Sequence, residues 1–221
     1  MNFPEKEKHA LKIIREALGF GRITVACSFG KDSVVTVDLV RRVKPDIDIF
    51  TVMTPFKFKE TRDYMQFMVK HWGINIRHFI RNEGPVGLWE TDPDKCCEYY
   101  KVEPTMEALE GYDAWITGLR RTEGWTRENL DYVELGKRPV KINPILDWTE
   151  TDIWRYFAFN RLPVHPLYAR GYRSLGCEPC STKPDDSQPE RAGRWKGTYK
   201  CGGECGIHSR DVMVSEAGKA I

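Results

Sequence analysis

The sequence contains no long hydrophobic run and no excess of charge of one sign. No apolar stretch approaches the ~20 residues that a membrane-spanning helix needs, and the first residues, MNFPEKEKHALKII, are too charged for a signal peptide. The 34 basic and 32 acidic side chains nearly cancel and form no long run, which argues against a general nucleic-acid or membrane surface. We therefore expect a cytoplasmic protein whose partner is small or specific.

Internal repeats and low-complexity tracts are absent as well. The chain has 221 residues, of which 41% are hydrophobic and 30% charged, and this is enough to bury one sizeable core. Structural disulfides are not expected, because we place the chain and its seven cysteines in the cytosol. The cysteines instead indicate metal or redox chemistry.

Apolar runs that alternate with helix-like segments predict an α/β fold. Strands are expected at 23–27, 46–53, 74–80, 113–117 and 140–143. Helices are expected at about 33–43, at 59–72 and after Thr149, which would cap its helix together with Asp152. Strands that alternate with helices imply a doubly wound parallel sheet with helices on both faces.

The chain changes character after Leu162. Prolines and glycines become frequent, and four of the seven cysteines lie between positions 177 and 205. This segment has too little periodicity to form a core of its own. We expect residues 1–162 to form the α/β domain and residues 163–221 to form an irregular C-terminal segment of the same structural unit.

The stretch CSFGKDS joins the first strand to the helix after it. A strand, a glycine turn and a helix N-terminus can place backbone N–H groups around an anion. The residues that would line such a site are Ser28, Gly30, Lys31, Asp32 and Ser33. The turn lacks the spacing of the Walker motif GxxxxGK[ST], so a loop that wraps a triphosphate is not indicated. The alternative is an ordinary tight turn in which a serine or aspartate caps the helix.

Two cysteine pairs, Cys96 with Cys97 and Cys177 with Cys180, lie eighty positions apart. Four thiolates form a full ligand set for zinc or for an iron–sulfur cluster. The side chains of adjacent residues tend to diverge. A cubane iron–sulfur cluster, which is larger than a single metal ion, can bind such a pair more easily. The residues therefore favour a [4Fe–4S] cluster over zinc. Buried free cysteines and an incidental disulfide are the alternatives.

A further thiol, Cys205, lies in the glycine-rich stretch KCGGECGIHSR. A thiol in such a tail can reach into a site, and nearby cations such as His208, Arg191 or Arg194 would lower its pKa. These features are typical of a mobile nucleophile. The alternative is a metal or disulfide pair with Cys201.

Several segments together resemble a known enzyme family. The turn CSFGKDS is similar to the PP-loop, consensus SGGxDS, of the adenine nucleotide α-hydrolase-like superfamily. The tandem cysteines with a lysine four positions on, AWITGLRR followed by TR, LPVHPLYARGYRSLGCEPC, RAGRW and ECGIH complete the set. In this order and spacing they resemble the assimilatory sulfonucleotide reductases, specifically the cluster-containing adenylyl-sulfate (APS) reductases. The resemblance spans most of the chain and implies the PP-loop fold.

The resemblance also implies roles for individual residues. Cys96, Cys97, Cys177 and Cys180 would ligate one [4Fe–4S] cluster, and Cys205 would attack the sulfur of APS to give S-sulfocysteine and AMP. Thioredoxin, or a glutaredoxin-type reductant, would then release sulfite. Lys101 would lie between cluster and substrate, and His208 would contact the phosphosulfate or tune the thiolate. The arginines that would hold the anionic ester are Arg120, Arg121, Arg127, Arg191 and Arg194, and for each the alternative is a solvated surface charge.

The sequence departs from the family pattern in three places. Met53-Thr54-Pro55 replaces an aspartate–threonine–glycine turn, which affects the expected adenosine contacts. Glu123-Gly124-Trp125 differs from the usual glutamine–serine step. Cys201 is an extra thiol, and a resolving cysteine that forms a disulfide with Cys205 is one alternative for its role. Other readings are a reductase of the 3′-phosphorylated substrate PAPS, a PP-loop iron–sulfur ATPase that inserts sulfur into nucleic acid, sulfate adenylyltransferase, and a nucleotide-sensing regulatory module. A homo-oligomer is compatible with each of these.

Overall fold

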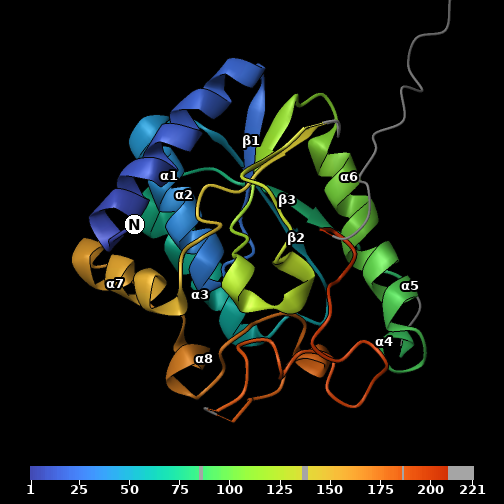
Figure 1. Ribbon diagram of the computed structural model, residues 1–221. Helices are drawn as coiled ribbons and strands as arrows, with labels where there is room; N and C mark the ends of the chain where they lie inside the picture. Colours follow the sequence, from blue (N-terminus) through green and yellow to red (C-terminus); the bar gives the residue numbers. More distant parts are fainter. Residues whose placement is uncertain (85–86, 136–138, 186, 209–221) are drawn as a thin grey trace, which may run out of the picture.

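A six-stranded sheet with helices on both faces forms the centre of the protein (Figure 1). The structure is a computed structural model and describes residues 1–84, 87–135, 139–185 and 187–208. The strands are β1 (Ile23–Ala26), β2 (Asp48–Met53), β3 (Arg77–Ile80), β4 (Ala114–Ile116), β5 (Val133–Glu134) and β6 (Val140–Ile142). Their order is β3-β2-β1-β4-β6-β5, and of these pairs only β5 with β6 is antiparallel. β1 therefore lies inside the sheet, with β2 on one side and β4 on the other.

The larger core covers one face of the sheet. It is formed by four amphipathic helices, namely α1 (Phe3–Ala17), α2 (Lys31–Val43), α3 (Lys59–Trp72) and α7 (Glu150–Asn160). Strand residues alternate between the faces, as they do in any strand. Ile23 and Val25 of β1, for example, pack into this core, and so do Ala114 and Ile116 of β4.

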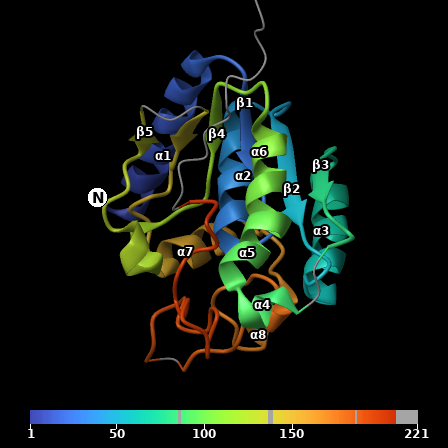
Figure 2. The same cartoon turned by 90° about the vertical axis from the view of Figure 1, so that its right-hand side faces the viewer.

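The opposite face is covered by a helical segment that contains the tandem cysteines. It runs through α5 (Pro93–Cys97), a π-helical turn (Glu98–Val102) and α6 (Glu103–Leu109), with the short α4 (Leu88–Thr91) before it. Trp115 and Phe50 point to this side and pack on Ala108 and Leu109 of α6. Figure 2 shows α6 lying across the strands and α4 and α5 continuing toward the end of the molecule where the C-terminal segment lies.

The residues after Leu162 form an irregular segment across one end of the sheet. Its helical turns are α8 (Pro166–Ala169) and the 3₁₀ turn Glu178–Cys180. Further 3₁₀ turns cover Leu18–Phe20, Arg121–Glu123 and Trp125–Arg127. Figure 1 shows the C-terminal segment, in orange and red, beneath the sheet and between α7 and α5.

The predicted fold class and most of its elements are confirmed. The helix predicted at 59–72 has these bounds, and α7 begins at the predicted cap, where Thr149 and Asp152 form a reciprocal capping box. Helix α2 begins at Lys31, two residues earlier than expected. The prediction did not include the helices α1, α4, α5, α6 and α8. It also did not include β5, because two residues are too short for a recognisable period.

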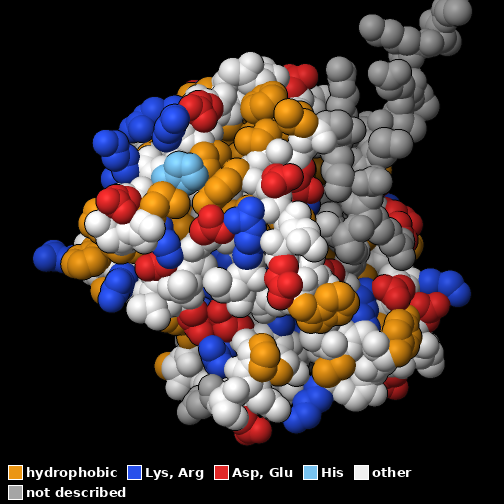
Figure 3. Space-filling view, viewed as in Figure 1, with side chains coloured by type: hydrophobic (Ala, Val, Ile, Leu, Met, Phe, Trp, Pro, Cys, Tyr) orange, Lys and Arg blue, Asp and Glu red, His pale blue; other side chains and the backbone are white. Residues whose placement is uncertain are grey.

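Charges of both signs are interspersed on the surface. Figure 3 shows lysine and arginine side chains next to aspartate and glutamate over the face that it draws. Within the part of the chain that the structure describes, no helix has the length and apolar character to cross a bilayer.

Candidate active site

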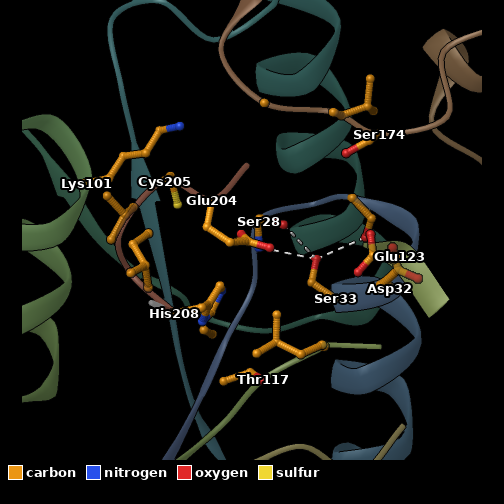
Figure 4. Close-up of a pocket in the computed structure, with 18 of the residues that line it drawn as sticks. Ser28, Asp32, Ser33, Lys101, Thr117, Glu123, Ser174, Glu204, Cys205 and His208 are labelled. Carbon is orange, nitrogen blue, oxygen red and sulfur yellow. Dashed lines mark hydrogen bonds between the residues drawn. The ribbon is translucent and has the colours of Figure 1, made fainter. Parts of the chain in front are cut away.

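A pocket lies where the carboxyl ends of β1, β2 and β4 meet the C-terminal segment (Figure 4). In parallel sheets this edge, at the point where the strand order reverses, is where ligands usually bind. The residues that line it include Ser28 after β1, Thr117 after β4, and Cys205 from the far end of the chain. Figure 4 shows Lys101 and Cys205 on one side of the pocket, and Asp32, Ser33 and Glu123 on the other. Segments widely separated in sequence therefore share one site.

The glycine turn forms the wall of the pocket at the start of α2. The Ser33 hydroxyl lies 3.2 Å from the backbone N–H of Ser28, which donates to it, and it donates to the carbonyl of Gly30. Phe29 adopts φ +62°, a conformation that costs a non-glycine residue roughly 1–2 kcal/mol, and its ring is fully buried. The backbone N–H of Lys31 donates to the Tyr168 hydroxyl at 2.7 Å. The C-terminal segment thus holds the first turn of α2.

Two of the basic residues predicted to bind substrate are committed to a buried carboxylate of the C-terminal segment. Lys31 Nζ lies 2.9 Å from Glu190 Oε2, and Arg120 Nη2 lies 2.7 Å from the same oxygen. Arg120 Nε also pairs with Asp32 at 2.6 Å. Burial lowers the pKa of Lys31, but Asp32 and other neighbouring acids outweigh burial and raise it above its usual range. Both cations therefore stay charged and tie the glycine turn to the segment that follows α8.

Arg120 and Arg121 lie outside the pocket. The Arg120 side chain is completely buried between Asp32 and Glu190 and does not contribute to the lining. Arg121 is partly exposed and pairs with Asp147. Arg127, Arg191 and Arg194 do line the pocket, as do the five predicted residues of the glycine turn.

Glu204, the residue before Cys205, is held by two arginines. Its carboxylate lies 2.6 Å from Arg127 Nε and 3.2 Å from Arg191 Nη2, and Arg127 also pairs with Glu123. Burial raises the pKa of Glu204, but Arg127 and Arg191 outweigh that and hold it well below the usual range. Burial lowers the pKa of Arg191 to about 10. This network attaches the segment that carries Cys205 to the loop that carries Arg127.

Three further cations face the pocket without a carboxylate partner among the described residues. Within the described residues, Lys57, Lys101 and Arg194 have no carboxylate at ion-pairing distance, although all three are buried. Burial lowers the pKa of Lys57 to about 8. Buried cations are costly unless an anion compensates them. The sequence analysis did not identify Lys57, whose one signal is its position in the turn that departs from the family pattern.

His208 lines the pocket next to Trp115. Its ring stacks on Trp115, with centroids 5.8 Å apart and planes at 11°. Burial, together with the nearby Lys141 and Arg127, lowers the pKa of His208 well below its usual range. The interpretation of His208 as a cation beside Cys205 stays a prediction, and this shift acts against the charged form of the imidazole.

Three buried polar atoms in the pocket lining have no hydrogen-bond partner among the described residues. They are Arg191 Nε, Trp195 Nε1 and His208 Nδ1. Buried polar atoms are nearly always paired with protein, water or ligand. Their presence around this pocket indicates that it is built to receive a polar ligand.

The four cysteines of the two pairs line a second, smaller pocket. Phe56, Trp89 and Tyr100 complete its wall, and Lys101 lines both this pocket and the larger one. All seven cysteines of the chain are free thiols. Within the described ranges, no three His, Cys, Asp or Glu side chains converge closely enough for a single metal ion. The four thiols of the two pairs are thus gathered in one pocket.

Comparison with known proteins now assigns the chain to a family. The sequence model of the phosphoadenosine phosphosulfate reductase domain matches residues 22–183. The chain belongs to this family. Adenosine 5′-phosphosulfate reductase 1 of Bacillus subtilis is 37% identical to it, over 94% of this chain and 95% of the relative. The adenosine 5′-phosphosulfate reductase of Oceanobacillus iheyensis is 38% identical, over 95% and 92%.

Solved structures agree with the family fold. The phosphoadenylyl-sulfate reductase of Candida auris superposes with a TM-score of 0.68 at 22% identity, over 80% of this chain and 94% of that one. The FMN adenylyltransferase of Candida glabrata superposes with a TM-score of 0.65 at 18% identity, over 89% and 75%. At these identities the likeness shows the fold alone. The reductase-family domain ends at residue 183, so Glu204, Cys205 and His208 lie beyond it but within the range shared with the Bacillus relative.

Proposed function

We propose that this reductase-family chain converts adenylyl sulfate to sulfite and AMP, with Cys205 as the nucleophile. The observation that carries the proposal is that Cys205 lines the same pocket as the glycine turn Ser28–Ser33. The names of the Bacillus and Oceanobacillus relatives agree with this substrate. The pocket thus combines an anion-binding edge with a thiol.

The glycine turn and the pocket cations would hold the phosphosulfate. Ser28, Gly30 and Ser33 would bind the phosphate side at the start of α2, and Lys31 and Asp32 would line this side of the pocket while paired with Glu190 and Arg120. Arg194 would supply charge and hydrogen bonds to the anionic ester, and Arg127 and Arg191, which are paired with Glu204, would add positive charge to the pocket wall. Arg120 and Arg121 would support the loop rather than contact substrate, since neither lines the pocket.

The reaction begins when the Cys205 thiolate attacks the sulfur of the bound ester. The new S–S bond forms as the bond between sulfur and the phosphate oxygen breaks, so that AMP leaves with the electron pair and Cys205 becomes S-sulfocysteine. A thiolate of thioredoxin then attacks Sγ of Cys205 and releases sulfite. The second thiol of thioredoxin resolves the mixed disulfide, and the dithiol supplies both electrons. The pocket cations reduce the repulsion between the thiolate and its anionic target.

We further propose that Cys96, Cys97, Cys177 and Cys180 hold a [4Fe–4S] cluster. The donor set fits the group, because four free thiols line one small pocket with aromatic walls. When bound, the cluster would supply charge and a fixed geometry, since nucleophilic attack on sulfur requires no electron from iron. Lys101 lines both pockets and would couple the cluster electrostatically to the substrate site.

One experiment tests the nucleophile directly. Wild type incubated with APS in the absence of reductant should gain one sulfonate group by intact mass spectrometry, and thioredoxin should then release sulfite in equal amount. Cys205→Ser should form no adduct and no AMP. Cys201→Ser is the matched control, because Cys201 is exposed and outside the pocket lining, and it should form the adduct. An adduct on Cys205→Ser would overturn the mechanism.

The same assay addresses the 3′-phosphorylated substrate. The name of the matched family domain and the fold neighbour from Candida auris both concern phosphoadenylyl sulfate, so PAPS is the second candidate. Initial rates of adduct formation with APS and PAPS, measured on one preparation, distinguish the two. We expect APS to react faster. A faster reaction with PAPS would make PAPS the substrate in place of APS.

A further inference from the structure

Lys57 is a buried cation in the pocket for which no sequence motif assigned a role. We propose that Lys57 binds the sulfonate end of the nucleotide substrate and positions the sulfur for attack by Cys205. The inference rests on the proposed function, since it assumes a sulfated nucleotide in this pocket. It adds a substrate-binding residue from the turn after β2, where the sequence departs from the family pattern.

The backbone around Lys57 is fixed on both sides. Its N–H donates to the carbonyl of Thr54 at 3.2 Å, and its own carbonyl accepts from Arg62 Nη1 at 2.5 Å. The backbone also bridges to Cys177, and the N–H of Glu178 donates to the carbonyl of Phe56. The Lys57 side chain therefore leaves from a rigid turn that is paired with the C-terminal segment. A group that must orient a reacting centre needs such support.

The charge of Lys57 is not compensated by the protein. Its side chain lines the pocket and is 7% exposed, yet the described residues offer it no carboxylate partner. The pocket carboxylates, Asp32, Glu123 and Glu204, are already paired with arginines. An ammonium group that is buried without a counter-ion costs free energy, which an anionic ligand would recover.

The position of Lys57 points to the sulfur end of the ester rather than to the adenosine. The side chains whose charges act most on Lys57 are Cys177, Lys101, Arg194 and Cys205. Lys101, Arg194 and Cys205 line the same pocket as Lys57, whereas Cys177 lines the neighbouring cysteine pocket, and the glycine turn is held by Tyr168 and Glu190. Attack by Cys205 requires the sulfonate within its reach, so the anion next to Lys57 is the one that carries the reacting sulfur.

A rival role for Lys57 is to balance the charge of the cysteine-bound cluster. Lys101 lines both pockets, but Lys57 lines only the larger one among the described residues. The geometry thus favours the substrate over the cluster as the partner of Lys57. The two roles differ in what a variant would lose, namely APS affinity in one case and iron in the other.

The test measures binding in a background that cannot turn over. APS and AMP are titrated by calorimetry into Cys205→Ser and into Cys205→Ser with Lys57→Met, each with its iron and sulfide counted. AMP lacks the sulfonate, so it reports on the adenosine and phosphate contacts alone. We expect APS affinity to fall roughly 10–100-fold, the loss typical for a charged hydrogen bond, and AMP affinity to stay within about twofold. Lys59→Met is the matched control, because Lys59 is exposed on the same segment, and it should change neither affinity.

Each other outcome has a definite meaning. Equal loss of APS and AMP affinity would show that Lys57 supports the fold or the nucleotide end, and would overturn the inference. A loss of iron with unchanged APS affinity per loaded chain would assign Lys57 to the cluster, and would also overturn it. Unchanged binding of both would leave the proposed function intact and remove Lys57 from it. No APS binding to Cys205→Ser, together with no adduct on wild type, would overturn the proposed function itself.

Discussion

Glu204 Oε1 lies 2.6 Å from Arg127 Nε, across a separation of 77 residues in the sequence. The pair is buried and connects the arginine loop after β4 to the residue that precedes Cys205. Arg191 completes the clamp through the Glu204 carboxylate and through the carbonyl of Gly203. The position of the proposed nucleophile is thus set by charge pairing in an otherwise irregular segment.

Replacing Glu204 with Gln should release this clamp. The variant keeps the shape of the side chain but removes its charge, and charged hydrogen bonds of this kind contribute about 1.5–3 kcal/mol each. We expect kcat for sulfite formation to fall roughly tenfold or more while the KM for APS does not rise, because Arg191 is freed for the substrate. Iodoacetamide should alkylate Cys205 faster in the variant.

The matched control for the clamp is Asp185→Asn, an exposed acidic residue of the same segment. It should leave kcat and the alkylation rate unchanged. Unchanged alkylation and kcat in Glu204→Gln would show that the ion pairs do not hold the tail.

Two glycines of the C-terminal segment should respond differently to alanine. A Cβ at Gly176 would meet the Arg194 guanidinium, a flexible group that can move away, whereas a Cβ at Gly193 would meet the backbone carbonyl of Thr182. Gly176→Ala should therefore weaken APS binding with little change in the thermal unfolding temperature. Gly193→Ala should lower that temperature by several degrees, as expected for about 1–3 kcal/mol of strain. The reverse pattern would contradict this reading of the segment.

Removing one proposed cluster ligand should remove the metal. Cys180→Ser should lose most of its iron and acid-labile sulfide, and its brown colour, because three thiolates with one hydroxyl hold a [4Fe–4S] cluster poorly. Cys27→Ala is the matched control, since Cys27 is a buried thiol outside the cysteine pocket, and it should keep its iron. A wild-type preparation with one zinc per chain and no sulfide would contradict the cluster assignment.

His165 should make folding sensitive to mild acid. Its Nδ1 accepts from the N–H of Leu167 at 3.2 Å, and its Nε2 lies 3.1 Å from the Thr61 hydroxyl. Burial, with the nearby charge of Lys57, lowers the pKa of His165 from 6.5 to about 4. Between these values the unfolded chain binds a proton that the folded chain does not, so stability is fully present above pH 6.5 and is lost as pH falls toward 4.

The loss attributable to His165 should reach up to about 3 kcal/mol at pH 4. The measurement is the slope of the unfolding temperature against pH for wild type and for His165→Gln. The variant should be less stable at pH 7, and its unfolding temperature should depend less on pH in this window. His78→Gln, at an exposed histidine of β3, is the matched control. If the unfolding temperature of His165→Gln depends on pH as steeply as that of wild type, His165 is not the source of the pH dependence.

Local sequence patterns predicted much of the fold. The strand β1, the helix α3 and the Thr149 cap of α7 each depend on residues that are close together in the chain. The structure has these elements where the sequence predicts them. The two-residue strand β5 was missed because its pairing with β6 is a tertiary event with no local signal.

The sequence by itself determined which chemical groups this protein carries: an anion-binding turn, two cysteine pairs, a set of arginines and a thiol near the C-terminal end. Only the tertiary structure decided which of those groups are free to act. Glu190 engages Lys31 and Arg120, Glu204 engages Arg127 and Arg191, and Lys57 is left without a partner among the described residues. Whether a charge is neutralised depends on partners brought from distant segments and on burial that strengthens each pairing. Neither can be read from the neighbours of a residue along the chain.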